Sequence, residues 1–89
     1  MKNVNNELFK RRQQQWIDSN PFRRWRKAND VTLMSAASIL DVSILPVRMW
    51  ESGSSTPNKK NFMKLKKLLN ISNLEEVWDA WKNQRPKYM

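Results

Sequence analysis

The sequence contains no cysteine and no histidine. The lack of cysteine excludes disulfide cross-links and fits a reducing compartment. Both absences together remove the commonest zinc ligands and the side chain that most often serves as a general base. Only eight Asp and Glu residues remain for acid–base chemistry, and they form no recognisable constellation. We therefore expect no metal, no cofactor and no enzymatic activity.

Long apolar runs are also absent. The longest run is only a few residues, whereas a membrane-spanning helix needs about 20 apolar residues. The Asn-rich start lacks the apolar core of a signal peptide. With 89 residues, the chain is long enough for one small domain with a modest core. We expect a cytoplasmic protein with no membrane contact.

Positive charge dominates what is present. Seventeen Lys and Arg residues against eight Asp and Glu give a net charge of +9. Such a charge on a small body attracts polyanions, either nucleic acid or an anionic membrane surface. The basic residues gather in residues 10–12, 23–27 and 59–67. They can also be ordinary solvated helix faces, so charge alone leaves both interpretations open.

The apolar spacing predicts helices at the start of the chain. Between residues 7 and 17 four bulky side chains share one half of a helical wheel: Leu8, Phe9, Trp16 and Ile17. Asn20 followed by Pro21 is typical of a cap and a first helical turn. It predicts a second helix over residues 21–29.

Residues 32 to 53 predict two short helices joined by a tight turn. Thr32 and Ser43 are expected to cap them. Asp41 tolerates the left-handed backbone of such a turn, and Gly53 ends the second helix in the same conformation. The side chains expected where the helices touch are Ala36, Ala37, Leu40, Val42, Val47 and Trp50. This layout is that of a helix-turn-helix, which mostly places one helix in the major groove of DNA.

Two more helices are predicted downstream, over residues 59–69 and from residue 74 to about 83. Ser72 or Asn73 is expected to cap the last one. The predicted fold class is all-α, a compact five-helix domain over residues 21–83. A basic N-terminal extension, residues 1–20, forms a helix or arm, and residues 84–89 form a flexible tail.

Four segments resemble a known family: residues 22–27, the helix pair from Thr32, residues 49–53 (Met-Trp-Glu-Ser-Gly) and residues 65–72. Together they are similar to the phage repressor and Cro-like (XRE-like) helix-turn-helix DNA-binding family, over residues 21–81. The resemblance implies an ion pair between Arg26 and Glu51 that locks the first core helix to the third. Its role is structural, because breaking one side would leave a poorly solvated charge.

The resemblance also implies a DNA-binding surface. The residues expected to face the bases are Ile44, Leu45, Arg48 and Met49. Those expected to contact phosphates are Thr32, Ser43, Ser52, Ser54, Ser55, Asn58, Lys59 and Lys60. The sequence departs from the family at Leu33, where Gln is usual, and at residues 44–46, where polar side chains usually bond to base edges. Ile44 and Leu45 can instead meet thymine methyl groups, or specificity can come from DNA shape and the N-terminal arm.

The tryptophans and the first basic group have competing interpretations. Trp25, Trp50 and Trp78 have core-facing spacing, whereas Trp16 and Trp81 can also cover a partner surface. The basic segment, which consists of Lys10, Arg11 and Arg12, belongs to a helix packed on the domain, to an arm along DNA, or to a docking peptide for another protein. Packing is favoured because the neighbouring apolar residues are bulky.

The function expected from the residues and the resemblance is sequence-specific binding of double-stranded DNA by a transcriptional regulator of a phage or mobile element. We expect a homodimer on a two-fold site. The main alternative is a protein-interaction module that binds RNA polymerase, a replication factor or a toxin partner through the apolar residues 44–46 and Met49. Binding of RNA or single strands rests on charge and Trp content alone.

Overall fold

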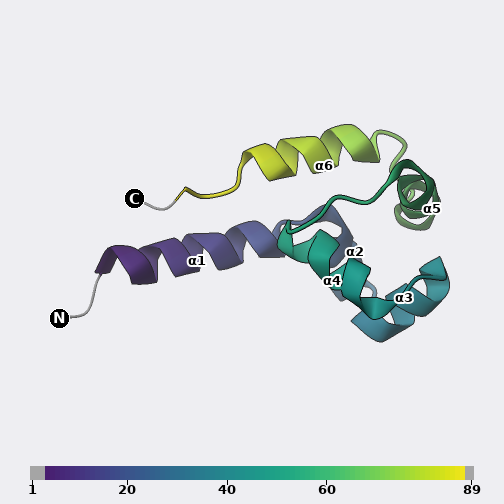
Figure 1. Ribbon diagram of the computed structural model, residues 1–89, viewed down its shortest axis with the longest axis horizontal. Coiled ribbons are helices and arrows are strands. Elements are labelled where there is room, and N and C mark those ends of the chain that lie inside the picture. Colours follow the sequence, from purple (N-terminus) through teal and green to yellow (C-terminus); the bar gives the residue numbers. More distant parts are fainter. Residues whose placement is uncertain (1–3, 88–89) are drawn as a thin grey trace.

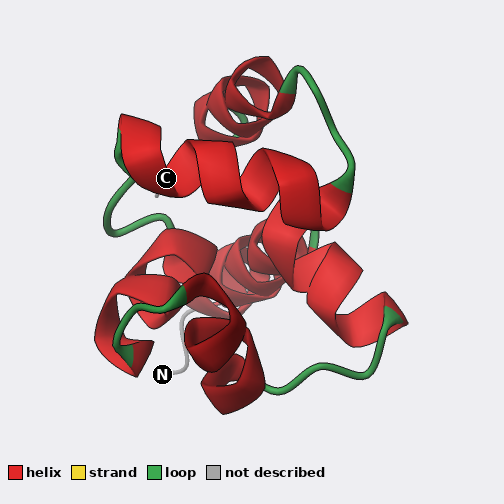
Figure 2. Ribbon diagram, turned by 90° about the vertical axis from the view of Figure 1, so that its right-hand side faces the viewer, coloured by secondary structure: helices red, strands yellow, loops and turns green. Residues whose placement is uncertain are grey.

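The structure is a computed structural model that describes residues 4–87 and consists of helices and loops, with no strand in that range (Figures 1 and 2). The helices are α1 (Val4–Asp18), α2 (Pro21–Ala28), α3 (Leu33–Leu40), α4 (Ile44–Ser52), α5 (Lys59–Leu69) and α6 (Leu74–Asn83). The all-α prediction is confirmed. Five helices fall within residues 21–83, and the N-terminal extension adds a sixth.

The molecule measures 47 × 25 × 21 Å, and α1 lies along its long axis. Helices α2 to α5 gather at one end, while the chain enters and leaves at the other end (Figure 1). None of the six helices is both long enough and apolar enough to cross a membrane by itself. α3 and α4 meet that criterion only as a pair, and the chain bends by 113° between them.

The end of α1 joins the core through two tryptophans. Trp16 and Trp81 are only 5% and 4% exposed, and their rings stack at a centroid distance of 4.2 Å. The Nε1 of Trp16 donates to the carbonyl of Trp81 at 2.6 Å, and the Nε1 of Trp81 donates to the carbonyl of Trp16 at 2.7 Å. The suggestion that these rings cover a partner surface is therefore wrong, because each buries its face and its polar edge against the other.

The five helices α2 to α6 all contribute to the remaining core. Its buried apolar members besides the two stacked rings are Phe22, Ala36, Ala37, Leu40, Val47, Trp50, Phe62, Leu65, Leu69, Leu74 and Trp78. Trp25 was expected inside the core, but it is only partly buried and packs against the edge of the core. A side chain this large often stays partly exposed in a domain this small.

Several predicted helix ends form as expected. The side chains of Asn20 and Thr32 accept hydrogen bonds from the first-turn amides of α2 and α3. Asn58, which was not predicted as a cap, does the same for α5. Asp41 and Gly53 adopt the left-handed conformation, with φ values of 56° and 79°. The capping bonds predicted for Ser43 and for Ser72 or Asn73 are wrong. Ser43 and Asn73 occupy the cap positions of α4 and α6, but neither side chain bonds to the helix.

The predicted tail, residues 84–89, lies partly outside the described residues, as do residues 1–3 of the extension. Within the described part, Arg85 lies over the ring of Trp16 at 5.3 Å from its centroid. Such a cation–π contact is worth about 0.5–1 kcal/mol at an exposed site. The first residues after α6 therefore contact the end of α1.

Candidate nucleic-acid interface

Helices α3 and α4 form the frame of the candidate interface. Three residues, 41–43, connect them. The left-handed Asp41 turns the chain sharply, and its backbone N–H closes the end of α3 on the carbonyls of Ala37 and Ser38. Ala36 and Ala37 are 0% and 4% exposed, so their small side chains permit close packing where the two helices meet. The result is a helix pair bent by 113°, and one face of its second helix lies outside the core.

The outer face of α4 holds the four predicted base-facing residues. Leu45 is 62% exposed, Ile44 and Met49 are each 36% exposed, and Arg48 is also exposed. The opposite face is buried, because Val47 and Trp50 pack into the core. This face therefore combines three apolar side chains with a single guanidinium.

Three predicted phosphate-contacting serines follow at the C-terminal end of α4. Ser52 Oγ donates to the carbonyl of Met49 at 3.2 Å and lies 2.8 Å from Ser54 Oγ. The backbone N–H of Ser55 also donates to the Met49 carbonyl, at 3.2 Å. These serines close the end of α4, whereas Ile44 and Leu45 begin it, so the predicted contacts extend over the full length of the helix.

The start of α5 brings together Asn58, Lys59 and Lys60. Asn58 Oδ1 accepts from the N–H of Asn61 at 2.9 Å, which fixes the first turn. Both lysines are exposed, and no acidic residue lies in that turn. Cations at the positive end of a helix dipole are unfavourable for the helix itself. The start of α5 is therefore a concentrated site of positive potential.

The two remaining phosphate candidates lie at the starts of α3 and α4. Thr32 Oγ1 accepts from the N–H of Ser35 at 3.1 Å and contacts Ser35 Oγ at 3.0 Å. Ser43 is exposed and its hydroxyl is not used as a cap. Ser43 is thus available to a ligand at the N-terminus of α4, while Thr32 already has a structural role.

Arg26 and Glu51 form the ion pair that the resemblance implies. Arg26 Nε lies 2.7 Å from Glu51 Oε2, and Nη2 lies 2.9 Å from Oε1. Arg26 also donates to the carbonyl of Val31 at 3.1 Å. The hydrogen bond to Glu51 raises the pKa of the Arg26 guanidinium above its ordinary value. With exposures of 8% and 4%, the two residues join α2 to the end of α4 inside the protein.

A second arginine, which the sequence did not single out, extends this pair toward α1. Arg23 Nη1 lies 3.3 Å from Glu51 Oε1, and Arg23 Nε lies 3.0 Å from Asp18 Oδ1. Gln14 donates to the same oxygen of Asp18 at 3.0 Å. The bond from Gln14 lowers the pKa of Asp18; partial burial opposes this, and Arg23 adds to the lowering. A spacing of five residues across a helix break gives no sequence signal for this contact.

The basic segment, Lys10, Arg11 and Arg12, lies within α1 and is exposed. None of its three side chains forms an ion pair with another described residue. The helix that carries it packs on the domain through Trp16 near its end, whereas Leu8, one of the bulky residues expected to pack, is 37% exposed. Its charges face outward, so packing of the helix leaves them available to a partner.

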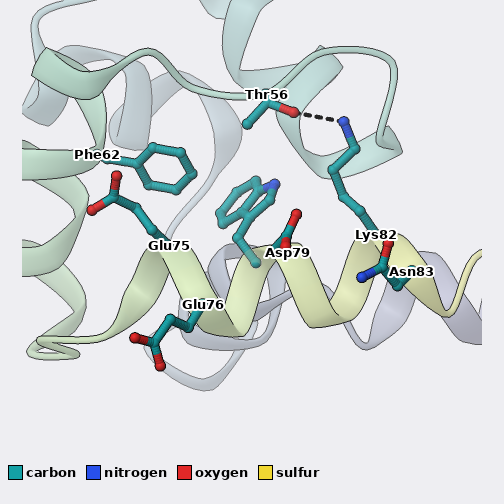
Figure 3. A pocket seen from close by; sticks show the side chains of 8 residues that line it. Thr56, Phe62, Glu75, Glu76, Asp79, Lys82 and Asn83 are labelled. Carbon is teal, nitrogen blue, oxygen red and sulfur yellow. Dashed lines mark hydrogen bonds between the residues drawn. The ribbon is translucent and has the colours of Figure 1, made fainter.

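A further site, outside the predicted one, is a pocket of about 640 Å³ over α6, which we call the acidic pocket (Figure 3). Its lining residues are Thr56, Phe62, Glu75, Glu76, Trp78, Asp79, Lys82 and Asn83. Trp78 is 1% exposed, and its Nε1 has no hydrogen-bond partner among the residues that the structure describes. An unpaired buried donor costs about 1–3 kcal/mol.

No metal centre accompanies either site, because the described residues contain no group of three or more side chains suited to holding a metal ion. Neither a protein-family model, nor a curated protein, nor a solved structure matches the chain. Any functional assignment for the chain therefore rests on its own geometry and charge.

Proposed function

We propose that the protein binds double-stranded DNA through a helix-turn-helix and acts as a transcriptional regulator. The observation that supports this most strongly is the α3–α4 pair. Its three-residue turn and 113° bend agree with the geometry of that motif, in which the helices meet at about 90–120°. The second helix then lies in the major groove with its exposed face toward the bases.

The division of labour follows from the chemistry of that face. Arg48 reads guanine through its two-pronged guanidinium, and Ile44 and Leu45 meet thymine methyl groups. Met49 completes the apolar contact. With one guanidinium among three apolar side chains, hydrogen-bonded readout is limited, so DNA shape contributes to site choice.

Phosphate contacts supply most of the affinity. The start of α5, with Lys59 and Lys60 beside the first-turn amides, is placed to bind a backbone phosphate. Ser43 at the start of α4 and the serines at its end flank the base-reading residues. A net charge of +9 draws the protein to DNA from a distance. A homodimer on a two-fold site, in a phage or mobile element, completes the proposal.

A second candidate function is supported by one observation. Ile44, Leu45 and Met49 place three exposed apolar side chains on one short helix. Adjacent exposed apolar groups often mark protein contacts. In this alternative the same surface of α4 docks on a protein such as RNA polymerase, a replication factor or a toxin partner.

The two candidates are tested by titrating the protein into labelled DNA from the region upstream of its own gene, and into a scrambled duplex of equal length. At about 50 and 200 mM salt, the logarithm of affinity should fall by about 0.9 for each neutralised phosphate per log unit of salt. The upstream duplex should bind more tightly than the scrambled one. An affinity that does not change with salt excludes the DNA proposal.

Substitutions on α4 test which side chains determine the preference for one DNA sequence. Replacing Arg48 and Met49 by alanine should abolish the preference for the upstream duplex, while helical content and affinity for scrambled DNA stay nearly unchanged. If Ile44→Ser with Leu45→Ser leaves all DNA binding intact but removes a protein partner, the docking alternative gains support. If none of the four substitutions alters site preference, α4 is not the reading element.

A further inference from the structure

The acidic pocket has a charge opposite to that of the molecule. It holds three of the eight acidic residues of a chain with a net charge of +9. Lys66 pairs with Glu75 at 2.5 Å, whereas Glu76 and Asp79 form no ion pair with any described residue. The one cation in the lining, Lys82, donates to Thr56 Oγ1 at 2.6 Å across the upper edge of the pocket (Figure 3). The pocket therefore attracts cations.

The unpaired N–H of Trp78 narrows the choice of ligand. A simple cation would satisfy the carboxylates but not this buried donor, which needs an oxygen acceptor. The occupant must present positive charge and a hydrogen-bond acceptor together. A helical segment with Lys or Arg next to an amide side chain meets both demands.

The basic segment of α1 has this composition. On a helix, Gln14 lies on the same face as Lys10 and Arg11, which precede it by four and three residues. The Nε2 of Gln14 donates to Asp18, and the side chain is exposed, so its carbonyl oxygen can serve as an acceptor. Both cations are exposed and lack an ion pair among the described residues.

We propose that the acidic pocket receives the basic segment of α1 from a second copy of the chain, and that two copies exchange these contacts across a two-fold axis. Lys10 and Arg11 pair with Glu76 and Asp79, and the Gln14 carbonyl accepts from Trp78 Nε1. A reciprocal contact closes on itself, as two-fold interfaces do. This assigns the homodimer of the proposed function a defined interface.

The first test measures the mass of the full chain by sedimentation equilibrium without DNA. The wild type should be a dimer at about 50 mM salt and should dissociate at about 1 M, where charges are screened within about 3 Å. Glu76→Gln with Asp79→Asn should weaken the dimer about tenfold or more. Ser38→Lys with Ala28→Lys changes the net charge by the same amount outside the pocket and serves as the control. It should weaken the dimer much less.

The second test is a charge exchange. One variant has Lys10, Arg11 and Arg12 changed to Glu, and the other has Glu76 and Asp79 changed to Lys. Each variant alone should be monomeric. In the first, the substituted segment is acidic and meets the acidic pocket; in the second, the substituted pocket is basic and meets the basic segment. An equimolar mixture should form a dimer with one copy of each, because both contacts of the pair are restored.

The indole of Trp78 reports on the contact directly. In the mixture, the variant with Glu at positions 10–12 is labelled, because it keeps the original pocket. Its Trp78 Nε1–H resonance should move on dimerisation, and Gln14→Ala in the unlabelled partner should reduce that shift. A monomeric wild type, a mixture that stays monomeric, or a species larger than a dimer overturns the proposal. Because DNA is absent, these outcomes are separate from the tests of DNA binding.

Discussion

Single residues connect α1 to α4, and Glu51 is central to this connection. It accepts from Arg26 and Arg23, and Arg23 in turn contacts Asp18 at the end of α1. Three helices therefore meet at one short run of charges. The charged side chains become more exposed from Glu51 outward to Asp18. This order predicts how much each ion pair contributes to the free energy of unfolding.

Arg26→Ala should lower the free energy of unfolding by about 3 kcal/mol, because it leaves the buried Glu51 carboxylate poorly compensated. Arg23→Ala should cost clearly less, since its contact with Glu51 is longer and its side chain is 21% exposed. Urea denaturation of both variants measures the difference. Equal losses would show that burial does not set the strength of these pairs.

Gln14→Ala should raise the pKa of Asp18 toward its ordinary value, because the bond from Gln14 is the main cause of its lowering. A lowered pKa stabilises the fold at neutral pH, and this contribution is lost as the pH falls through the folded-state pKa. Carboxyl chemical shifts followed by NMR during acid titration measure the pKa. If the shift of Asp18 is unchanged in the variant, Arg23 and not Gln14 dominates.

Gly53 shows the tightest fit between a single residue and its surroundings. A Cβ at this position would lie 2.4 Å from Cη2 of Trp16, and φ is 79°. Gly53→Ala should therefore destabilise the fold by about 2 kcal/mol or more. The same change in a Trp16→Phe background should cost less if the larger ring is the obstacle. Thermal melts of the four proteins give the coupling.

At the level of the helices, the lysines at the two ends of α5 interact with its dipole in opposite ways. Lys59 and Lys60 at its start are unfavourable for the dipole, whereas Lys66 and Lys67 in its last turn are favourable. The two ends should consequently respond in opposite ways to loss of charge. Lys59→Ala with Lys60→Ala should leave the fold as stable or slightly more stable, yet weaken binding to every DNA sequence alike and reduce the salt slope by about 2.

Lys67→Ala is the matched control for that prediction, because it removes a lysine from the other end of the same helix. It should cost about 0.3–1 kcal/mol of stability and leave DNA affinity nearly unchanged. Chemical denaturation and anisotropy titrations on the same samples separate the two effects. A change in preferred sequence on loss of Lys59 and Lys60 would contradict their assignment to phosphates.

The sequence predicted the helices well because their signals are local. Pro21 restricts the backbone at the start of a helix, whereas Asp41 and Gly53 tolerate the left-handed conformation that ends one. Apolar spacing supplied the buried faces. Ser43 shows the limit of such reasoning: its position at the cap was right, but whether its hydroxyl bonds depends on a side-chain torsion that the sequence does not specify.

Contacts between distant segments were the part that sequence reasoning missed. Trp16 and Trp81 are 65 residues apart, and nothing in the sequence near either residue indicates that the two rings stack. The contact of Arg23 with Asp18 and the unpaired N–H of Trp78 likewise depend on how helices meet. By contrast, the pairing of Arg26 with Glu51 was accessible only through a family resemblance.

At the level of the whole molecule, the absence of histidine makes the charge nearly constant in the middle of the pH range. No side chain present has an ordinary pKa between about 5.5 and 7. Both the free energy of unfolding and the affinity for DNA should therefore be flat over that interval. Denaturation and titration at three pH values test this, and a clear slope would reveal a carboxyl group with a strongly raised pKa.

The parallel stack of Trp16 on Trp81, tilted by only 2°, also has an optical consequence. Two indole rings held this close couple their excited states, which gives a paired circular-dichroism band and alters their emission. The chain therefore has a built-in spectroscopic reporter of whether α1 is docked. The signal requires no added dye, so loss of this stack during denaturation can be followed in the unlabelled protein.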